Sequence, residues 1–151
     1  MPASRPADFA VVYEWQEGSL PPPYHYAYTL RIGPGESGSI AYQPDYAFSN
    51  PPVWTEPLAL SAADLDALYA LAVARGVLRE RWADVDDPPV GGEVEWAEIT
   101  VDGRVYALPA HVSAADQEAV QAVYAAIRAL VPAAIWEKLE AQRQAYMDAH
   151  P

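Results

Sequence analysis

Cysteine is absent from this chain, and its absence removes several classes of protein from consideration. Without cysteine there is no disulfide scaffold, no thiolate nucleophile and no cysteine-based zinc or iron–sulfur site. No other motif in the sequence indicates a cofactor. We therefore expect the protein to work without one.

Positive charge is also scarce. Nine Lys and Arg residues stand against 21 Asp and Glu residues, which gives a net charge of −12, and Lys138 is the only lysine. Nucleic acids and anionic membranes are bound largely through Lys and Arg, because these side chains displace counterions from phosphate groups. We therefore expect neither a nucleic-acid partner nor a membrane partner.

Long apolar runs are missing as well. No segment approaches the roughly 20 apolar residues of a membrane span, and residues 1–8 lack the basic and apolar regions of a signal peptide. The sequence therefore predicts a cytoplasmic protein. Its 151 residues, 52% of them hydrophobic, contain no linker and no repeat, so we expect one domain over residues 1–151. Residues 1–8 and 148–151 are expected to fray.

Alternating apolar residues predict three strands in the first half of the chain, over residues 9–16, 24–32 and 38–43. Only short segments separate them, so an antiparallel meander is favoured over parallel pairing. Residues 44–58 contain four prolines among aromatic side chains. Because proline interrupts hydrogen-bonded structure, we expect this segment to be a long loop.

Helix caps and a hairpin turn organise the second half. Ser61 predicts the start of one helix and Ser113 the start of another, because serine side chains cap exposed backbone N–H groups. Between them, a strand begins at Glu93, and Asp102-Gly103 predicts a hairpin into residues 104–108. Residues 133–149 are helical by propensity, with Pro132 marking either a kink or a new helix start.

Together these elements predict an α+β fold. We expect an antiparallel sheet of about five strands, a meander plus a hairpin, with two to three helices packed on one face. One strand breaks its own alternation, because Val94 and Trp96 fall on the opposite face from Ile99 and Val101. A bulge near Ala97 would restore a single apolar face, and we predict one there.

No motif fixes a reaction. None of the three histidines, His25, His111 and His150, lies in the G-x-S-x-G pattern of a serine hydrolase. A G-x-G-x-x-G pattern at residues 33–38 lies between two predicted strands, whereas the dinucleotide fingerprint joins a strand to a helix. We interpret that pattern as a turn and expect no enzymatic activity.

Acidic residues concentrate between Arg79 and Asp102, where eight acids accompany two arginines. Asp84, Asp86 and Asp87 begin like a calcium-binding loop, but the prolines that follow break the EF-hand pattern. The segment therefore predicts a solvated acidic loop without a bound metal. The next two acids, Glu93 and Glu95, share one face of a strand and repel each other, so we expect that face to be exposed.

Two groups of aromatic residues are candidates for binding. Tyr46, Phe48 and Trp54 lie in the proline-rich loop, and rigid aromatic side chains of this kind are enriched at recognition surfaces. The same loop could instead fold over an end of the sheet. A second group, the tyrosines of residues 24–28, continues the apolar face of its strand, and we place it near the rim where helix cover ends.

The sequence therefore favours a non-catalytic protein-binding or regulatory module. Its predicted binding surface consists of Tyr46, Phe48 and Trp54, with Asp84, Asp86 and Asp87 steering a protein partner that has a basic surface. One alternative is a divalent-metal-dependent hydrolase that uses the carboxylates of residues 84–95, in which those three aspartates are weak metal candidates. Another alternative is a binder of neutral carbohydrate or a small ligand on the aromatic loop of residues 42–54. Self-association into a homo-oligomer is also possible on sequence grounds.

Overall fold

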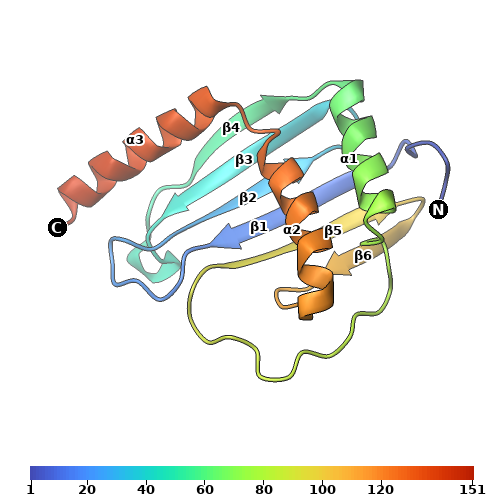
Figure 1. The fold of residues 1–151 in the computed structure, drawn as a ribbon. Helices are drawn as coiled ribbons and strands as arrows, with labels where there is room; N and C mark the ends of the chain where they lie inside the picture. Colours follow the sequence, from blue (N-terminus) through green and yellow to red (C-terminus); the bar gives the residue numbers. More distant parts are fainter.

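The computed structural model describes residues 1–151 and shows an α+β fold, one antiparallel sheet with three helices (Figure 1). The elements follow in the order β1 (Ala10–Gln16), β2 (Tyr26–Ile32), β3 (Ser37–Pro44), the 3-10 helix η1 (Ala47–Ser49), β4 (Trp54–Ala59), α1 (Ala62–Ala74), β5 (Val94–Val101), β6 (Arg104–Leu108), α2 (Ala114–Arg128) and α3 (Ala133–Ala149). The strands lie in the order β4-β3-β2-β1-β5-β6, so the first strand of the chain is near the middle of the sheet.

The predicted meander of β1, β2 and β3 is confirmed. Each pair is antiparallel and in unbroken register, with Tyr13 opposite Leu30 and Leu30 opposite Ile40. These three side chains are fully buried. The alternation in the sequence predicts them correctly because a half-buried sheet places every second residue in the core.

The proline-rich segment is not a continuous loop, and the sheet has six strands where about five were expected. Residues Trp54–Ala59 form β4, which pairs with β3 at the edge of the sheet and places Pro57 opposite Ser39. An edge strand accepts proline because the missing N–H group can lie on the side without a neighbouring strand. Proline density therefore excludes a central strand, but it does not exclude an edge strand.

The predicted bulge near Ala97 is also wrong. The register between β1 and β5 runs without interruption from Ala10 opposite Thr100 to Gln16 opposite Val94. The apolar residues of β5 therefore do change from one face of the strand to the other. As a result, the inward face of β5 changes from apolar residues to Glu95. This carboxylate lies on the face that the helices cover, where exposure to solvent was expected.

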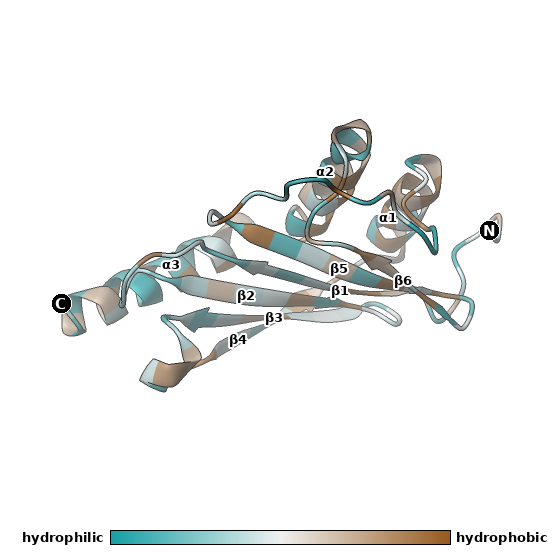
Figure 2. Cartoon of the chain, turned by 90° about the horizontal axis from the view of Figure 1, so that it is seen from below, coloured by the Kyte–Doolittle hydropathy of each residue, from teal (hydrophilic) through white to brown (hydrophobic).

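Helices α1 and α2 lie side by side over that face (Figure 2). Helix α1 begins with a capping box between Ser61 and Asp64, as the serine predicts. Each helix buries one apolar stripe against the sheet: Leu65, Leu68, Tyr69 and Ala72 from α1, and Val120, Val123, Tyr124 and Ile127 from α2. The hydrophobic core lies between these two stripes and the inner residues of the strands.

Helix α3 is a separate helix rather than a kinked continuation of α2. Pro132 is its N-cap residue, and the two helices are bent by 86°. Helix α3 turns back over the β2–β4 side of the same face, where Leu139 is buried and Lys138 pairs with Glu56 of β4. No single helix has the length and apolar content to cross a membrane, and only the bent pair of α2 and α3, counted together, meets that test by length and composition.

Candidate functional site

Four aromatic side chains form a continuous row across four strands. Trp15, Tyr28, Tyr42 and Trp54 are direct cross-strand neighbours on β1, β2, β3 and β4, and all four lie on the inner face. Their ring centroids are 5.2, 6.2 and 5.9 Å apart in that order, with interplanar angles of 14°, 12° and 22°. Cross-strand aromatic pairs stabilise a sheet and also fix the rings in one orientation. We call these four residues the aromatic row.

The row ends at a carboxylate. Glu95 of β5 is the direct neighbour of Trp15, so it occupies the fifth position of the same line across the sheet. Arg128 of α2 donates to Glu95 at 2.7 Å, Gln121 of α2 donates to it at 2.8 Å, and the Tyr13 hydroxyl donates to it as well. Helix α2 thus fixes Glu95 from above, while the sheet fixes it from below.

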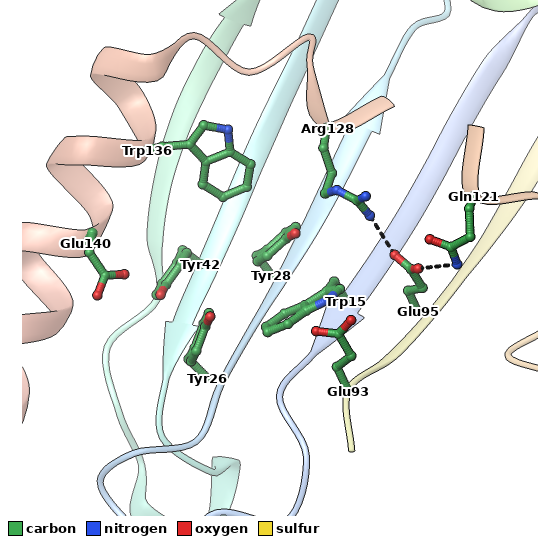
Figure 3. A pocket seen from close by; sticks show the side chains of 10 residues that line it. All are labelled: Trp15, Tyr26, Tyr28, Tyr42, Glu93, Glu95, Gln121, Arg128, Trp136 and Glu140. Atoms are coloured by element: carbon green, nitrogen blue, oxygen red, sulfur yellow. Dashed lines mark hydrogen bonds and ion pairs between the residues drawn. The ribbon is translucent and has the colours of Figure 1, made fainter. Parts of the chain in front are cut away.

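A pocket of about 520 Å³ lies over Trp15, Tyr28 and Tyr42 of the row, between the diverging helices α2 and α3 (Figure 3). The sheet supplies its floor, α2 and α3 supply opposite walls, and the start of β5 supplies the acidic end. Its lining residues are Trp15, Tyr26, Tyr28, Tyr42, Glu93, Glu95, Gln121, Arg128, Trp136 and Glu140. A concave, aromatic pocket with a few convergent polar groups is the usual form of a ligand site.

Three carboxylates and one guanidinium line this pocket. Glu95 is paired with Arg128, and Glu140 is paired with Arg143 at 2.9 Å, while Glu93 makes no ion pair or hydrogen bond. Arg143 itself lies with its guanidinium carbon 4.1 Å from the centre of the Tyr26 ring. The opposite charges cancel within each of these two ion pairs. The charge of Glu93 is left without a counter-charge, and the pocket is therefore negative.

The tyrosines of the floor hold their protons more tightly than free tyrosine does. Burial is the main cause that raises the pKa of Tyr28 and of Tyr42, and for Tyr42 the charge of Glu140 adds to it. Both hydroxyls are therefore neutral at physiological pH and able to donate or accept hydrogen bonds. The hydroxyl of Tyr42 has no hydrogen-bond partner although its side chain is only 2% exposed. A buried hydroxyl without a partner is costly, and this one is sealed from the cavity by its neighbours.

The structure separates the three aromatic residues that the sequence groups together. Tyr46 stacks between His25 and Phe48 at one end of the sheet, with centroid distances of 3.9 and 5.0 Å, and Phe48 is 78% exposed. Trp54 belongs instead to the aromatic row, where it is half-buried against Tyr42. The proposed three-residue surface is therefore not one surface.

Asp84, Asp86 and Asp87 lie exposed on the loop between α1 and β5, as the sequence predicts for a solvated acidic segment. Nowhere in residues 1–151 do three or more His, Asp or Glu side chains converge in a way that could hold a metal ion. The metal-dependent hydrolase that would use these carboxylates therefore gains no support from the geometry.

Sequence reasoning missed most of the pocket, including Trp15, Arg128 and Trp136. Two signals pointed toward it. The first is the change of parity in β5, which places Glu95 on an otherwise apolar face. The second is the change from aliphatic residues to tyrosine along β2, which we placed near the end of helix cover. Neither signal identifies α3 as the opposite wall, because that depends on the bend at Pro132.

Neither the protein-family models nor the curated proteins searched contain a match to this chain. The function is therefore inferred from the chemistry of the pocket. Its aromatic floor supplies contact area at a low cost in side-chain entropy, its hydroxyl and amide groups supply hydrogen bonds, and its carboxylates favour a positively charged guest.

Proposed function

We propose that this protein is a non-catalytic binding module that holds a positively charged side chain of a basic protein partner in the pocket between α2 and α3. The observation that carries the proposal is the charge of the lining. Glu93 has no counter-charge, and Arg128, the one basic residue of the lining, is already paired with Glu95. A cationic group that enters the pocket would therefore meet a carboxylate without displacing an existing partner.

The remainder of the molecule supports a basic partner. Its net charge of −12 would attract a positively charged surface over long distances at low ionic strength. The acidic loop also adjoins the pocket, because a second cavity of about 420 Å³ is lined by both Asp87 and Glu95. Asp84, Asp86 and Asp87 therefore have a place in the proposal as steering charges beside the site.

The hydrogen bonds that Glu95 already accepts favour binding over catalysis. Both of its carboxylate oxygens already accept hydrogen bonds, one from Gln121 and the other from Arg128 and Tyr13. A general base needs an oxygen that is available to the substrate proton. A carboxylate held in this way is suited to shaping a rigid site.

The test uses acetylated, amidated pentapeptides of the form Gly-Gly-X-Gly-Gly, where X is Arg, Lys, Gln or Glu. Binding is followed by the fluorescence of Trp15 and Trp136 and by calorimetry. We expect the two cationic peptides to bind and the Gln and Glu peptides to bind at least about tenfold more weakly, with an affinity that falls as salt rises. Equal binding of all four peptides would overturn the proposal.

The matched variants are Glu93→Gln and Glu98→Gln. Both glutamates are exposed on the same stretch of chain, but Glu93 lines the pocket whereas Glu98 is on the opposite face of β5. Glu93→Gln should weaken the cationic peptides several-fold, and Glu98→Gln should leave them unchanged. Equal loss in both variants would show a nonspecific charge effect. Quenching by maltose, without any response to the cationic peptides, would instead favour the carbohydrate alternative.

A further inference from the structure

The two edge strands of the sheet, β4 and β6, differ in what their backbones offer to another chain (Figure 1). A free strand edge carries unpaired N–H and C=O groups, so it can accept a further strand. At the β4 edge, Pro57 has no N–H group and interrupts the row of donors. Strand β6 contains no proline, so all of its backbone donors are present.

The outward groups of β6 belong to Val105 and Ala107. In an antiparallel ladder only every second residue bonds to the neighbouring strand, and the residues between them direct both backbone groups to the other side. Trp82 shows which residues these are, because its indole N–H donates to the carbonyl of Ala107 at 2.9 Å from outside the sheet. The N–H of Ala107 and both backbone groups of Val105 therefore point toward the free edge as well.

Trp82 covers this edge, and it is the only group outside the sheet that bonds to the backbone of β6. The guanidinium carbon of Arg79 lies 4.0 Å from the centre of the Trp82 ring, and Arg104 of β6 pairs with Glu80 at 3.0 Å. Residues 79–82 thus lie beside β6 without any backbone hydrogen bond to it. Exposed contacts of this kind are weak, so a strand that offers several backbone hydrogen bonds can replace them.

The loop beside β6 favours a basic strand over a second copy of this chain. Asp84, Asp86 and Asp87 are exposed there, and none of them forms an ion pair. A cavity of about 400 Å³ connects this loop with the edge, because Asp84 and Val85 line it together with Ala107. Pairing of two copies through β6 would bring two acidic loops to one edge, where like charges repel. A positively charged strand would be attracted instead.

We propose that the edge of β6 accepts an extended, positively charged segment of a partner protein as an additional strand of the sheet. The segment forms backbone hydrogen bonds with Val105 and Ala107, and the indole of Trp82 leaves the Ala107 carbonyl when the segment binds. This surface goes beyond the proposed function and is separate from the pocket between α2 and α3, because no residue of β6 lines that pocket.

The ligand test uses the acetylated, amidated peptide Lys-Thr-Val-Thr-Val-Thr-Lys and a matched peptide methylated at its central amide nitrogens. Methylation keeps the charge and removes the N–H groups that a strand needs. Calorimetry measures binding, and hydrogen exchange followed by NMR reports on the amides of Val105 and Ala107. We expect the unmethylated peptide to bind at least about tenfold more tightly and to slow exchange at both amides. Equal binding of the two peptides, or unchanged exchange at both amides, would overturn the inference.

The first variant test compares Val105→Pro with Thr55→Pro. Both residues are exposed on an edge strand, and Thr55 of β4 lies two residues from Pro57, so its N–H also points away from the sheet. Proline at either position therefore removes no hydrogen bond of the sheet. Val105→Pro should weaken the strand peptide at least about tenfold, and Thr55→Pro should leave it unchanged. An unchanged affinity in Val105→Pro would contradict the proposal, and the methylated peptide tests the same point on the unaltered protein.

The second variant test is Trp82→Phe, which keeps an aromatic ring beside Arg79 and removes the indole N–H. Because the Ala107 carbonyl is then free before binding, the strand peptide should bind about three- to tenfold more tightly. Weaker binding would show that the indole contacts the peptide instead of covering its site, and would overturn this part of the proposal.

The outcomes separate this inference from the proposed function. Glu93→Gln should leave the strand peptide unchanged, and Val105→Pro should leave the Arg pentapeptide unchanged. A loss of strand-peptide binding in Glu93→Gln would place that peptide in the pocket and overturn the inference, while the proposed function would stand. A dimer in sedimentation experiments that Val105→Pro abolishes would assign the edge to a second copy of the chain and overturn the inference as well.

Discussion

The inner face of the sheet has two halves that share the same strands but differ in side-chain type and in helix cover. One half, which we call the closed half, is aliphatic and lies under α1 and α2, with Val11, Leu30, Ile40 and Ile99 all buried. The other, the open half, carries the aromatic row and Glu95 only two or four residues further along the same strands. The backbone scaffold is continuous between them, and the helix cover is not.

The difference shows how a small α+β fold can combine a stable core with an open, aromatic pocket. In the closed half, apolar surface is removed from water by packing against the helices, which is the main source of folding stability. In the open half, the bend of 86° between α2 and α3 leaves the floor partly uncovered. The side chains there change to residues that keep one polar end while still packing laterally, as tyrosine and tryptophan do.

Alkaline pH should destabilise the fold as a whole, because buried tyrosine hydroxyls lie under α2 as well as in the open half. Burial raises the pKa of Tyr13, Tyr28 and Tyr42 in the folded state above the unfolded value of about 10. The neutral hydroxyls therefore contribute stability that is fully present below about pH 10 and is lost as the pH rises above it. Urea midpoints measured between about pH 8 and pH 11 should fall steeply only in the upper part of that range. A flat profile would contradict the burial of these hydroxyls.

A cavity in the closed half should cost more stability than the loss of a whole ring in the open half. Ile40→Ala should lower the free energy of unfolding by about 2–5 kcal/mol, because Ile40 is fully buried between strands and helices. Trp136→Ala should cost only about 1 kcal/mol, because Trp136 is partly exposed at the pocket wall, yet it should weaken the Arg pentapeptide about tenfold. Chemical denaturation and calorimetry measure the two effects. An equal loss of stability in Trp136→Ala and Ile40→Ala would contradict the expected difference in stability between the open half and the closed half.

Removing Glu95 should have an intermediate effect on stability. The side chain of Glu95 is 13% exposed and that of Arg128 is 33% exposed, so the loss of the pair leaves a charge that is only partly solvated. Glu95→Ala should therefore cost about 1–2 kcal/mol, less than for a fully buried pair. The exposed Glu98→Ala on the same strand is the control and should stay within about 0.5 kcal/mol of the parent. Equal effects of the two variants on the urea midpoint would show that the Glu95 network contributes no stability.

The smallest expected effect on stability comes from the acidic loop. Replacing Asp84, Asp86 and Asp87 together by Asn should leave the free energy of unfolding within about 0.5 kcal/mol, because all three are exposed. The same variant should slow association with a Gly-Arg repeat peptide at low salt, and this difference should disappear at high salt. Stopped-flow fluorescence measures both rates. A faster dissociation or a lost stability would place these aspartates inside the site instead of beside it.

The fold was largely predictable because its elements carry local signals. Strand alternation predicts β1, β2 and β3, the Asp102-Gly103 turn predicts the hairpin, and the span of α3 matches residues 133–149. The missing strand β4 shows the limit of such signals. Its proline argues against a ladder, and only its position at the sheet edge, which is a property of the tertiary structure, removes that objection.

The site was not predictable to the same degree, and the error at β5 explains why. A bulge near Ala97 was invoked because one strand is expected to keep one apolar face. The structure keeps the regular register and places Glu95 inward, where Arg128 from a helix more than thirty residues later neutralises it. A local pattern that contradicts the expected core often marks a functional position. At β5 the break in the apolar alternation was itself the signal for the inward position of Glu95. Predicting a bulge near Ala97 hid that signal.

The strand order has a consequence for how this protein is made. Because β1 pairs with β2 on one side and with β5 on the other, half of its backbone groups have no partner until residue 101 has been synthesised. The pocket is completed later still, since its floor comes from residues 15–42, its acidic end from residues 93–95 and its walls from residues 121–140. A nascent chain therefore carries an exposed aromatic surface until nearly its last helix has emerged, and an interaction of that surface with a chaperone or another chain would compete with folding. The complete pocket consequently exists only after the sheet and both of its helical walls have folded.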